Sequence, residues 1–198
     1  PRQSGKTTTM VAVILWFILF NESFNCAILA NKASTAREIL SRLQMAYEWL
    51  PHWLQQGLVE WNKGSLELEN GSKVLASSTS SSAIRGGSFS LVYLDEFAFV
   101  DSQLQEEFFA SVYPTISSGR TSRVMITSTP KGMNLFYKLW VDAEEGRNEY
   151  VPIQVHWSAV PGRDEEWKEQ TIKNTSEEQF RQEFECDFIG SSNTLINP

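Results

Sequence analysis

Hydrophobic positions change their spacing repeatedly along the chain, which predicts alternating helices and strands. Helical spacing is found over residues 6–20, 34–50, 102–117, 133–145, 165–173 and 177–184. Short apolar runs of strand length occupy residues 24–30, 91–94, 123–127 and 150–156. Residues 65–76 are typical of a hairpin, because Asn70-Gly71 tolerates the positive φ angles of a tight turn. The alternation predicts an α/β fold with a mostly parallel central sheet flanked by helices.

Boundary signals and hydrophobic runs refine these elements. Ser34 is a candidate cap for the second helix, and Pro51 ends it. The run Leu91–Leu94 is continuously apolar rather than alternating, which favours a strand covered on both faces. The most apolar segment, 10–20, is 11 residues long. A bilayer span needs about 20 residues, so we interpret this segment as a buried helix.

Composition supports a folded, acidic protein. The chain has 198 residues, of which 41% are hydrophobic and 12% aromatic, enough for a sizeable core. Lys and Arg number 17 against 24 Asp and Glu, for a net charge of −7, which excludes a histone-like coat for nucleic acid. Cys26 and Cys186 form no C-x-x-C pattern, which argues against a disulfide scaffold or zinc site and fits a reducing compartment.

The first residues carry candidate phosphate-binding chemistry. A Gly-containing loop that runs into a helix offers backbone N–H groups to an anion; a Lys there reaches the β- and γ-phosphates, and a Thr hydroxyl coordinates Mg²⁺. The alternative is a plain capped helix start, because the first Gly of the full pattern would lie at or before Pro1. The candidate nucleotide-binding residues are Gln3, Ser4, Gly5, Lys6, Thr7 and Thr8.

Two adjacent carboxylates, Asp95 and Glu96, follow the apolar run at 91–94. Open α/β sheets bind ligands at the carboxyl ends of their strands. Asp95 is therefore a candidate for the Mg²⁺ shell together with Thr7, and Glu96 for orienting and deprotonating the attacking water. The alternative is that both residues merely end a strand.

Hydroxyl side chains follow the predicted strand at 123–127. Thr127, Ser128 and Thr129 are candidates for contacting the γ-phosphate or the water and for coupling hydrolysis to the rest of the protein. Thr129 before Pro130 is also typical of a helix N-cap followed by Pro at the first helical position, and both roles can coexist.

Two arginines are candidates for stabilising the charge that develops during phosphoryl transfer. Arg2 lies inside the candidate phosphate loop and can act in cis. Arg85 lies in a Gly- and Ser-rich segment ten residues before Asp95, which suits a finger that reaches a neighbouring subunit; a solvated loop Arg is the alternative.

In order along the chain, these motifs resemble the N-terminal ATPase domain of the large terminase subunit of tailed bacteriophages, T-even-like viruses in particular. The motifs that carry the resemblance are Gln3–Thr7, Trp61–Ser65, Ile84–Gly86, Tyr93–Phe99, Pro114–Gly119 and Thr127–Gly132.

The resemblance implies a P-loop NTPase fold of the ASCE type. We expect an ATPase core at residues 1–160. Residues 161–198 are expected to contain helices that form a lid or continue toward a further domain, followed by the start of a linker. The resemblance implies ATP and Mg²⁺ as cofactors, and it gives the site residues named above the roles described for them. It also implies that the strand before the phosphate loop and a nuclease domain lie outside this sequence.

The resemblance further implies a DNA-packaging motor that acts in the host cytoplasm. Its expected partners are double-stranded DNA, the portal protein of the procapsid, the small terminase subunit and further copies of itself in a ring, usually a pentamer. Two other functions stay open: a helicase-like P-loop ATPase, and a truncated assembly module that no longer hydrolyses ATP.

Overall fold

The computed structural model describes residues 1–80, 87–117 and 122–190. The chain forms two compact units. One contains Gly5–Thr127, and the other joins Pro1–Ser4 to Ser128–Pro198. The predicted division at residue 160 stays a prediction.

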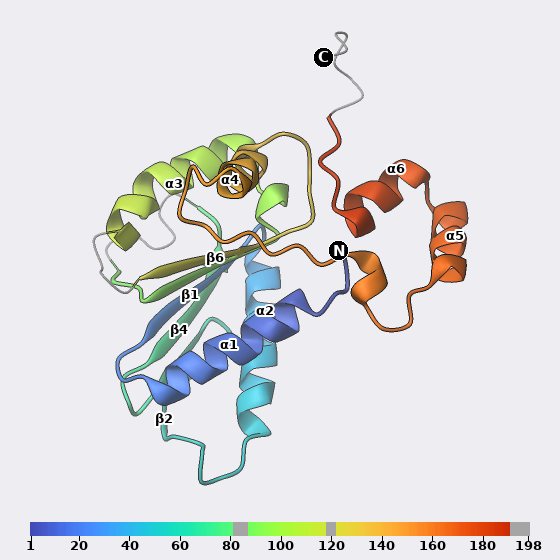
Figure 1. Ribbon diagram of the computed structural model, residues 1–198. Coiled ribbons are helices and arrows are strands. Elements are labelled where there is room, and N and C mark those ends of the chain that lie inside the picture. Colours follow the sequence, from blue (N-terminus) through green and yellow to red (C-terminus); the bar gives the residue numbers. More distant parts are fainter. Residues whose placement is uncertain (81–86, 118–121, 191–198) are drawn as a thin grey trace. The chain divides into compact units, whose positions relative to one another are not determined.

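The larger unit is built on a sheet whose strand order, in the described residues, is β2-β3-β4-β1-β5-β6. The parallel pairs are β4 with β1, β1 with β5 and β5 with β6, whereas β2 and β3 join the sheet antiparallel. The predicted mostly parallel α/β fold is therefore confirmed (Figure 1). The strands are β1 (Asn25–Ala30), β2 (Leu58–Trp61), β3 (Ser65–Leu68), β4 (Lys73–Ser78), β5 (Leu91–Asp95) and β6 (Arg123–Thr127).

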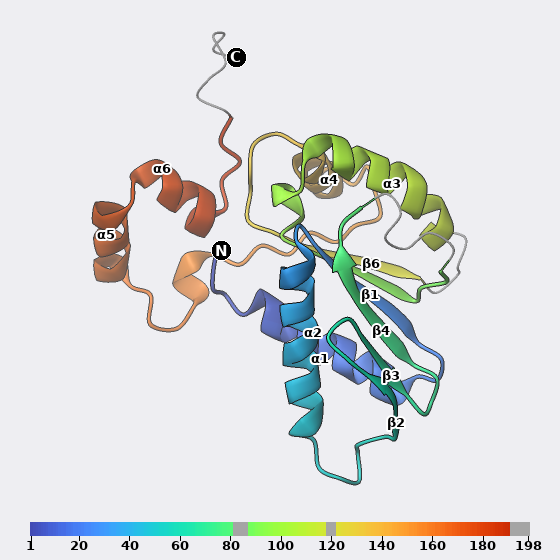
Figure 2. The same ribbon diagram turned by 180° about the vertical axis from the view of Figure 1, so that it is seen from behind.

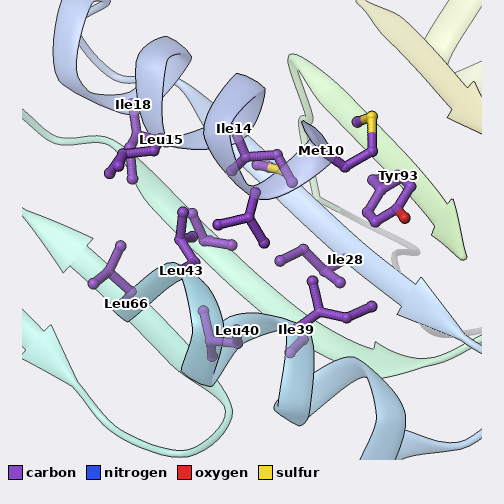
Figure 3. Close-up of a cluster of buried hydrophobic side chains, with 14 of the residues drawn as sticks. Met10, Ile14, Leu15, Ile18, Ile28, Ile39, Leu40, Leu43, Leu66 and Tyr93 are labelled. Carbon is purple, nitrogen blue, oxygen red and sulfur yellow. The ribbon is translucent and has the colours of Figure 1, made fainter. Parts of the chain in front are cut away.

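Helices α1 (Lys6–Phe20) and α2 (Ala33–Glu48) cover one face of this sheet. Their apolar sides meet alternate residues of the strands in a single buried cluster, in which Ile14, Ile18 and Ile28 are completely buried (Figure 3). Burying one such side chain contributes about 2 kcal/mol. Helix α1 is thereby fixed against the sheet.

Helix α3 (Ser102–Ser117) lies on the opposite side of the sheet from α1 and α2, as the two views in Figures 1 and 2 show. Leu29 of β1 and Val92 and Leu94 of β5, which point to this side, are completely buried. Because β5 is covered on both faces, its continuous apolar sequence is explained.

The described part of the other unit contains three α-helices, α4 (Leu135–Glu144), α5 (Glu165–Asn174) and α6 (Glu177–Phe180), and a short 3-10 helix at Trp157–Ala159. Helix α6 continues as a wider turn over Arg181–Glu185. Around α5 and α6, rings pack together with centroid separations from 5.2 to 6.0 Å. This aromatic cluster consists of Trp157, Trp167, Phe180 and Phe184. No described helix is both long enough and apolar enough to cross a bilayer.

Two local predictions are wrong. Residues 150–156 form no strand, and Val151 and Ile153 are largely exposed; an extended segment becomes a strand only when a neighbour pairs with it, and the described residues provide none here. Ser34 does not cap α2, because Lys32 occupies the N-cap position and Ser34 already lies inside the helix.

Candidate functional site

The two candidate carboxylates lie where β5 ends. Asp95 is the last residue of the strand and is 5% exposed, while Glu96 follows in a left-handed conformation with φ 49°. A non-glycine residue in this conformation costs about 1 kcal/mol. Strained backbone of this kind concentrates at functional sites, and here it turns the chain sharply directly after the buried carboxylate.

Two hydroxyl groups hold the Asp95 carboxylate. The Tyr93 phenol donates to Oδ1 at 2.7 Å, and the Thr127 hydroxyl donates to the same oxygen at 2.9 Å. Thr127 lies directly opposite Asp95 in the β5–β6 register. Oδ2 receives no hydrogen bond from the described part of the chain, so it is the oxygen left for water or a hydrated cation.

Tyr93 was not among the candidate residues, because it lies within the apolar run at 91–94. The available signal was its position two residues before Asp95, which places both side chains on the same face of a strand. Tyr93 is completely buried. Burial and the neighbouring Asp95 charge raise the pKa of the phenol well above its ordinary value, so Tyr93 stays protonated and donates.

The start of α1 lies over this face of β5. Met10 belongs to the same buried cluster as Tyr93, and Figure 3 shows the two side chains close together. Lys6 and Thr7 precede Met10 by four and three residues, so helix geometry places them on the same side of α1. Lys6 and Thr7 therefore share the side of α1 on which Met10 enters the cluster that contains Tyr93.

The loop before α1 contains two residues with left-handed backbone, Gln3 with φ 54° and Gly5 with φ 81°. Gly5 occupies the N-cap position of α1 and makes no side-chain cap hydrogen bond. Ser4 instead donates from its hydroxyl to the Pro1 carbonyl at 2.8 Å. When right-handed and left-handed backbone conformations alternate, successive N–H groups point toward one side and can bind an anion. Thr8 is exposed one residue further on.

The three candidate coupling residues have different surroundings. Thr127 bonds to Asp95 as described, Ser128 donates to the Thr129 carbonyl at 2.8 Å, and Thr129 is 1% exposed. The capping role predicted for Thr129 is wrong, because α4 begins only at Leu135 and is capped by the Asn134 side chain.

Of the two candidate arginines, Arg2 lies within the described residues. The Arg2 side chain is exposed, and its backbone N–H donates to the Glu183 carbonyl at 2.8 Å. Arg85 lies outside the described residues.

The donor chemistry suits a magnesium ion held jointly by protein and phosphate. The described residues contain no group of three or more His, Cys, Asp or Glu side chains able to hold a metal unaided. Mg²⁺ in phosphoryl-transfer sites takes only one or two protein ligands and completes its shell with water and phosphate oxygens. The buried carboxylate of Asp95 and the hydroxyl of Thr7 match that requirement.

Comparison with known proteins identifies the family. The family model described as terminase large subunit, T4-like virus type, N-terminal, matches residues 1–198. The chain belongs to this terminase family. The recognition made from the sequence motifs is thus confirmed.

Individual relatives agree with this terminase assignment. The large terminase subunit of Thermus phage G20c is 30% identical over an alignment of 129 residues, with 58% of this chain and 26% of that protein covered. This terminase chain therefore matches about a quarter of the length of its curated relative.

Solved structures share the terminase fold. The large terminase ATPase domain of Thermus phage P74-26 matches with a TM-score of 0.71 at 22% identity, covering 95% of this chain and 86% of that one. The large terminase of bacteriophage HK97 matches with a TM-score of 0.74 at 18% identity, covering 94% and 45%. The large terminase of another thermophilic bacteriophage, in complex with ADP, matches with a TM-score of 0.71 at 12% identity, covering 95% and 46%.

Proposed function

We propose that this chain is a Mg²⁺-dependent ATPase that drives double-stranded DNA into a viral procapsid. The observation that carries the proposal is the carboxylate pair at the end of β5, with Asp95 held by Tyr93 and Thr127 on the side of the sheet where α1 begins. The structures of a thermophilic bacteriophage's large terminase in complex with ADP and with ATP-γ-S support a nucleotide as the ligand.

The loop and first helical turn at residues 3–8 bind the nucleotide. The backbone N–H groups of Gln3, Ser4 and Gly5 surround the phosphates, and Lys6 neutralises charge on the β- and γ-phosphates. Thr8 extends the same first turn. Thr7 and Asp95 hold Mg²⁺, which when bound offsets the negative charge of the phosphates.

Glu96 activates the attacking water. Its carboxylate accepts a proton as the water oxygen bonds to the γ-phosphorus, while the bond from that phosphorus to the bridging oxygen breaks and ADP leaves. Glu96 follows Asp95 with a left-handed backbone, which supports a division of roles in which Asp95 serves the metal and Glu96 the water. Arg2 in cis and Arg85 in trans stabilise the developing charge, and Thr127, Ser128 and Thr129 transmit the outcome.

The partners follow from the proposed packaging role. We infer a ring of subunits, usually a pentamer, assembled with the small terminase subunit on the portal of a procapsid in the host cytoplasm. With a net charge of −7, this chain is expected to grip DNA weakly and locally, and its DNA affinity is expected to fall as salt rises.

The proposal is tested by measuring Mg²⁺-ATP binding and steady-state hydrolysis for the parent, Lys6→Ala, Glu96→Gln and the control Glu60→Gln. Glu60 is exposed on β2, where it accepts hydrogen bonds from Asn62 and Ser65, and it has none of the proposed site roles. We expect Lys6→Ala to lose binding, Glu96→Gln to bind while losing about 100-fold or more in turnover, and Glu60→Gln to match the parent. Turnover that survives in Glu96→Gln contradicts the assigned role.

The two alternatives are separated by what stimulates the activity. A packaging motor responds to procapsids together with DNA, whereas a helicase-like ATPase responds to DNA alone. An inactive assembly module binds no nucleotide in any of these variants.

The trans role of Arg85 has its own test. Arg85→Ala is expected to abolish turnover in assembled rings while nucleotide binding by isolated subunits is unchanged. Normal hydrolysis by Arg85→Ala rings rules out the finger.

A further inference from the structure

We propose that Arg163 is a positioning residue for the phosphate loop: it clamps the loop backbone at Arg2 and Gln3 and thereby sets nucleotide affinity. This inference rests on the proposed function, because it concerns the loop assigned there to the phosphates. Arg163 lies 160 residues beyond Gln3 in the sequence, just before α5, and was not among the candidates found from the sequence.

The contacts are made to the backbone of the loop rather than to its side chains. Nη2 of Arg163 donates to the Arg2 carbonyl at 2.8 Å and to the Gln3 carbonyl at 3.2 Å. The N–H of Arg2 donates in turn to the Glu183 carbonyl at 2.8 Å. Two segments near the C-terminal helices, one on each side of α5 and α6, thus hold consecutive peptide groups of the loop.

The guanidinium is itself held by aromatic rings. Its central carbon lies 4.7 Å from the centre of the Trp167 ring and 5.4 Å from that of Phe184, both members of the aromatic cluster. Such cation–π contacts fix the plane of the group and leave its edges free to donate. Asp164, the next residue, caps α5 by accepting from the Trp167 N–H at 2.9 Å, which fixes where the Arg163 side chain starts.

The surroundings of the Arg163 guanidinium do not favour a purely stabilising role, because a partly buried charge without a carboxylate partner lowers the stability of the fold. No carboxylate of the described residues forms an ion pair with Arg163, and its buried Nη1 has no hydrogen-bond partner among them. Partial burial lowers the pKa of Arg163, which reflects the cost of removing the charge from water. The loop carbonyls are the only hydrogen-bond acceptors that the described residues offer this side chain.

The loop needs such support because Gln3 has a left-handed backbone, with φ 54°. Side chains other than glycine adopt this conformation at a cost, so a free loop would populate other conformations. Arg163 bonds to the carbonyls of Arg2 and Gln3. These bonds favour the loop conformation in which the backbone N–H groups after Gln3 converge. A loop without the clamp pays that ordering cost on binding, which weakens affinity and leaves the chemical step unchanged.

The test compares Arg163→Met and Arg163→Lys with a matched control, Arg181→Met, in the full protein. Methionine keeps apolar packing on the rings but donates nothing, and lysine keeps the charge and one donor. Arg181 lies in the same unit, and among the described residues its half-exposed side chain bonds to Asp187 and not to the loop. Mg²⁺-ATP dissociation constants, KM and kcat are measured for each variant.

We expect Arg163→Met to raise the dissociation constant and KM roughly tenfold, the loss typical of one hydrogen bond to a charged group, with kcat within about twofold of the parent. Arg163→Lys recovers part of the affinity, and Arg181→Met matches the parent. Unchanged affinity in Arg163→Met, or a loss confined to kcat, overturns the proposal.

A second measurement covers the case in which Arg163→Met fails to fold. In the parent, Mg²⁺-ADP is expected to slow backbone hydrogen exchange in peptides spanning 163–185, and Lys6→Ala is expected to show no such effect. Absence of protection in the parent overturns the clamp.

The proposed function and the clamp can fail separately. A parent protein that binds no nucleotide refutes the proposed function. The clamp is then judged by hydrogen exchange in residues 2–4, which speeds up in Arg163→Met only if Arg163 holds this loop.

Discussion

The Tyr93 phenol and the Asp95 carboxylate, two residues apart on one buried strand, are joined by a 2.7 Å hydrogen bond. Since both side chains point to the same face of β5, the strand itself fixes their separation. The carboxylate proposed to hold Mg²⁺ is therefore oriented by its own strand as well as by Thr127 on the neighbouring one.

Tyr93→Phe is expected to raise the Mg²⁺ concentration for half-maximal ATPase activity about threefold to tenfold, because it removes one of the two hydroxyl donors to Oδ1. Magnesium-dependent binding of a fluorescent nucleotide provides a readout apart from turnover. The control is Tyr113→Phe on the exposed part of α3. An unchanged Mg²⁺ dependence in Tyr93→Phe means that Tyr93 does not position the carboxylate.

Thr127 provides a matched pair of substitutions. Thr127→Val keeps the shape of the side chain but removes the donor to Asp95, whereas Thr127→Ser keeps the donor. We expect the valine variant to lose about 1 to 2 kcal/mol of unfolding free energy and most of its turnover, and the serine variant to retain both. Urea unfolding and steady-state kinetics decide, and equal behaviour of the two variants contradicts a role for the hydroxyl.

Cys26 makes stability depend on pH. It is completely buried, and burial raises the pKa of its thiol above the ordinary value of about 8.5. Above about pH 8.5 the unfolded thiol ionises while the native one stays protonated, so stability is full below that pH and falls by up to about 1.4 kcal/mol per pH unit above it.

Urea unfolding between pH 8 and 10 measures this slope. Cys26→Ala is expected to flatten the slope and the partly exposed Cys186→Ser to leave it unchanged. Tyr93, whose pKa is also raised, adds to the slope only above about pH 10. Equal slopes in the two cysteine variants would refute the assignment.

Ile14→Ala is expected to cost about 2 to 5 kcal/mol of unfolding free energy, because Ile14 is completely buried between α1 and the sheet. Thr9→Ala, at an exposed position of the same helix, is the control and should change stability by less than about 0.5 kcal/mol. Chemical denaturation measures both. A small effect at Ile14 would mean that α1 is not fixed against the sheet.

Several elements could be predicted residue for residue from the sequence. The structure places α1 at Lys6–Phe20, α3 at Ser102–Ser117 and β6 at Arg123–Thr127, as the hydrophobic spacing indicated. In each case the local hydrophobic spacing and the burial in the folded protein favour the same element, so tertiary contacts do not change the local preference.

The predictions that failed needed information from elsewhere in the chain. Segment 150–156 has the composition of a strand, but pairing depends on a neighbour, which spacing does not reveal. The Thr127 bond to Asp95 depends on strand register, and the Arg163 contact depends on where a distant loop lies. The candidate carboxylates were found because adjacency in the sequence is itself their signal.

Because Glu96 has a left-handed backbone, stability and the proposed activity favour different residues at this position. Glycine adopts that conformation without steric cost, and asparagine at a lower cost than most residues. A library selected for heat resistance alone is therefore expected to enrich glycine or asparagine at position 96 and to discard the proposed catalytic carboxylate. Selection for a thermostable motor has to score turnover in the same round.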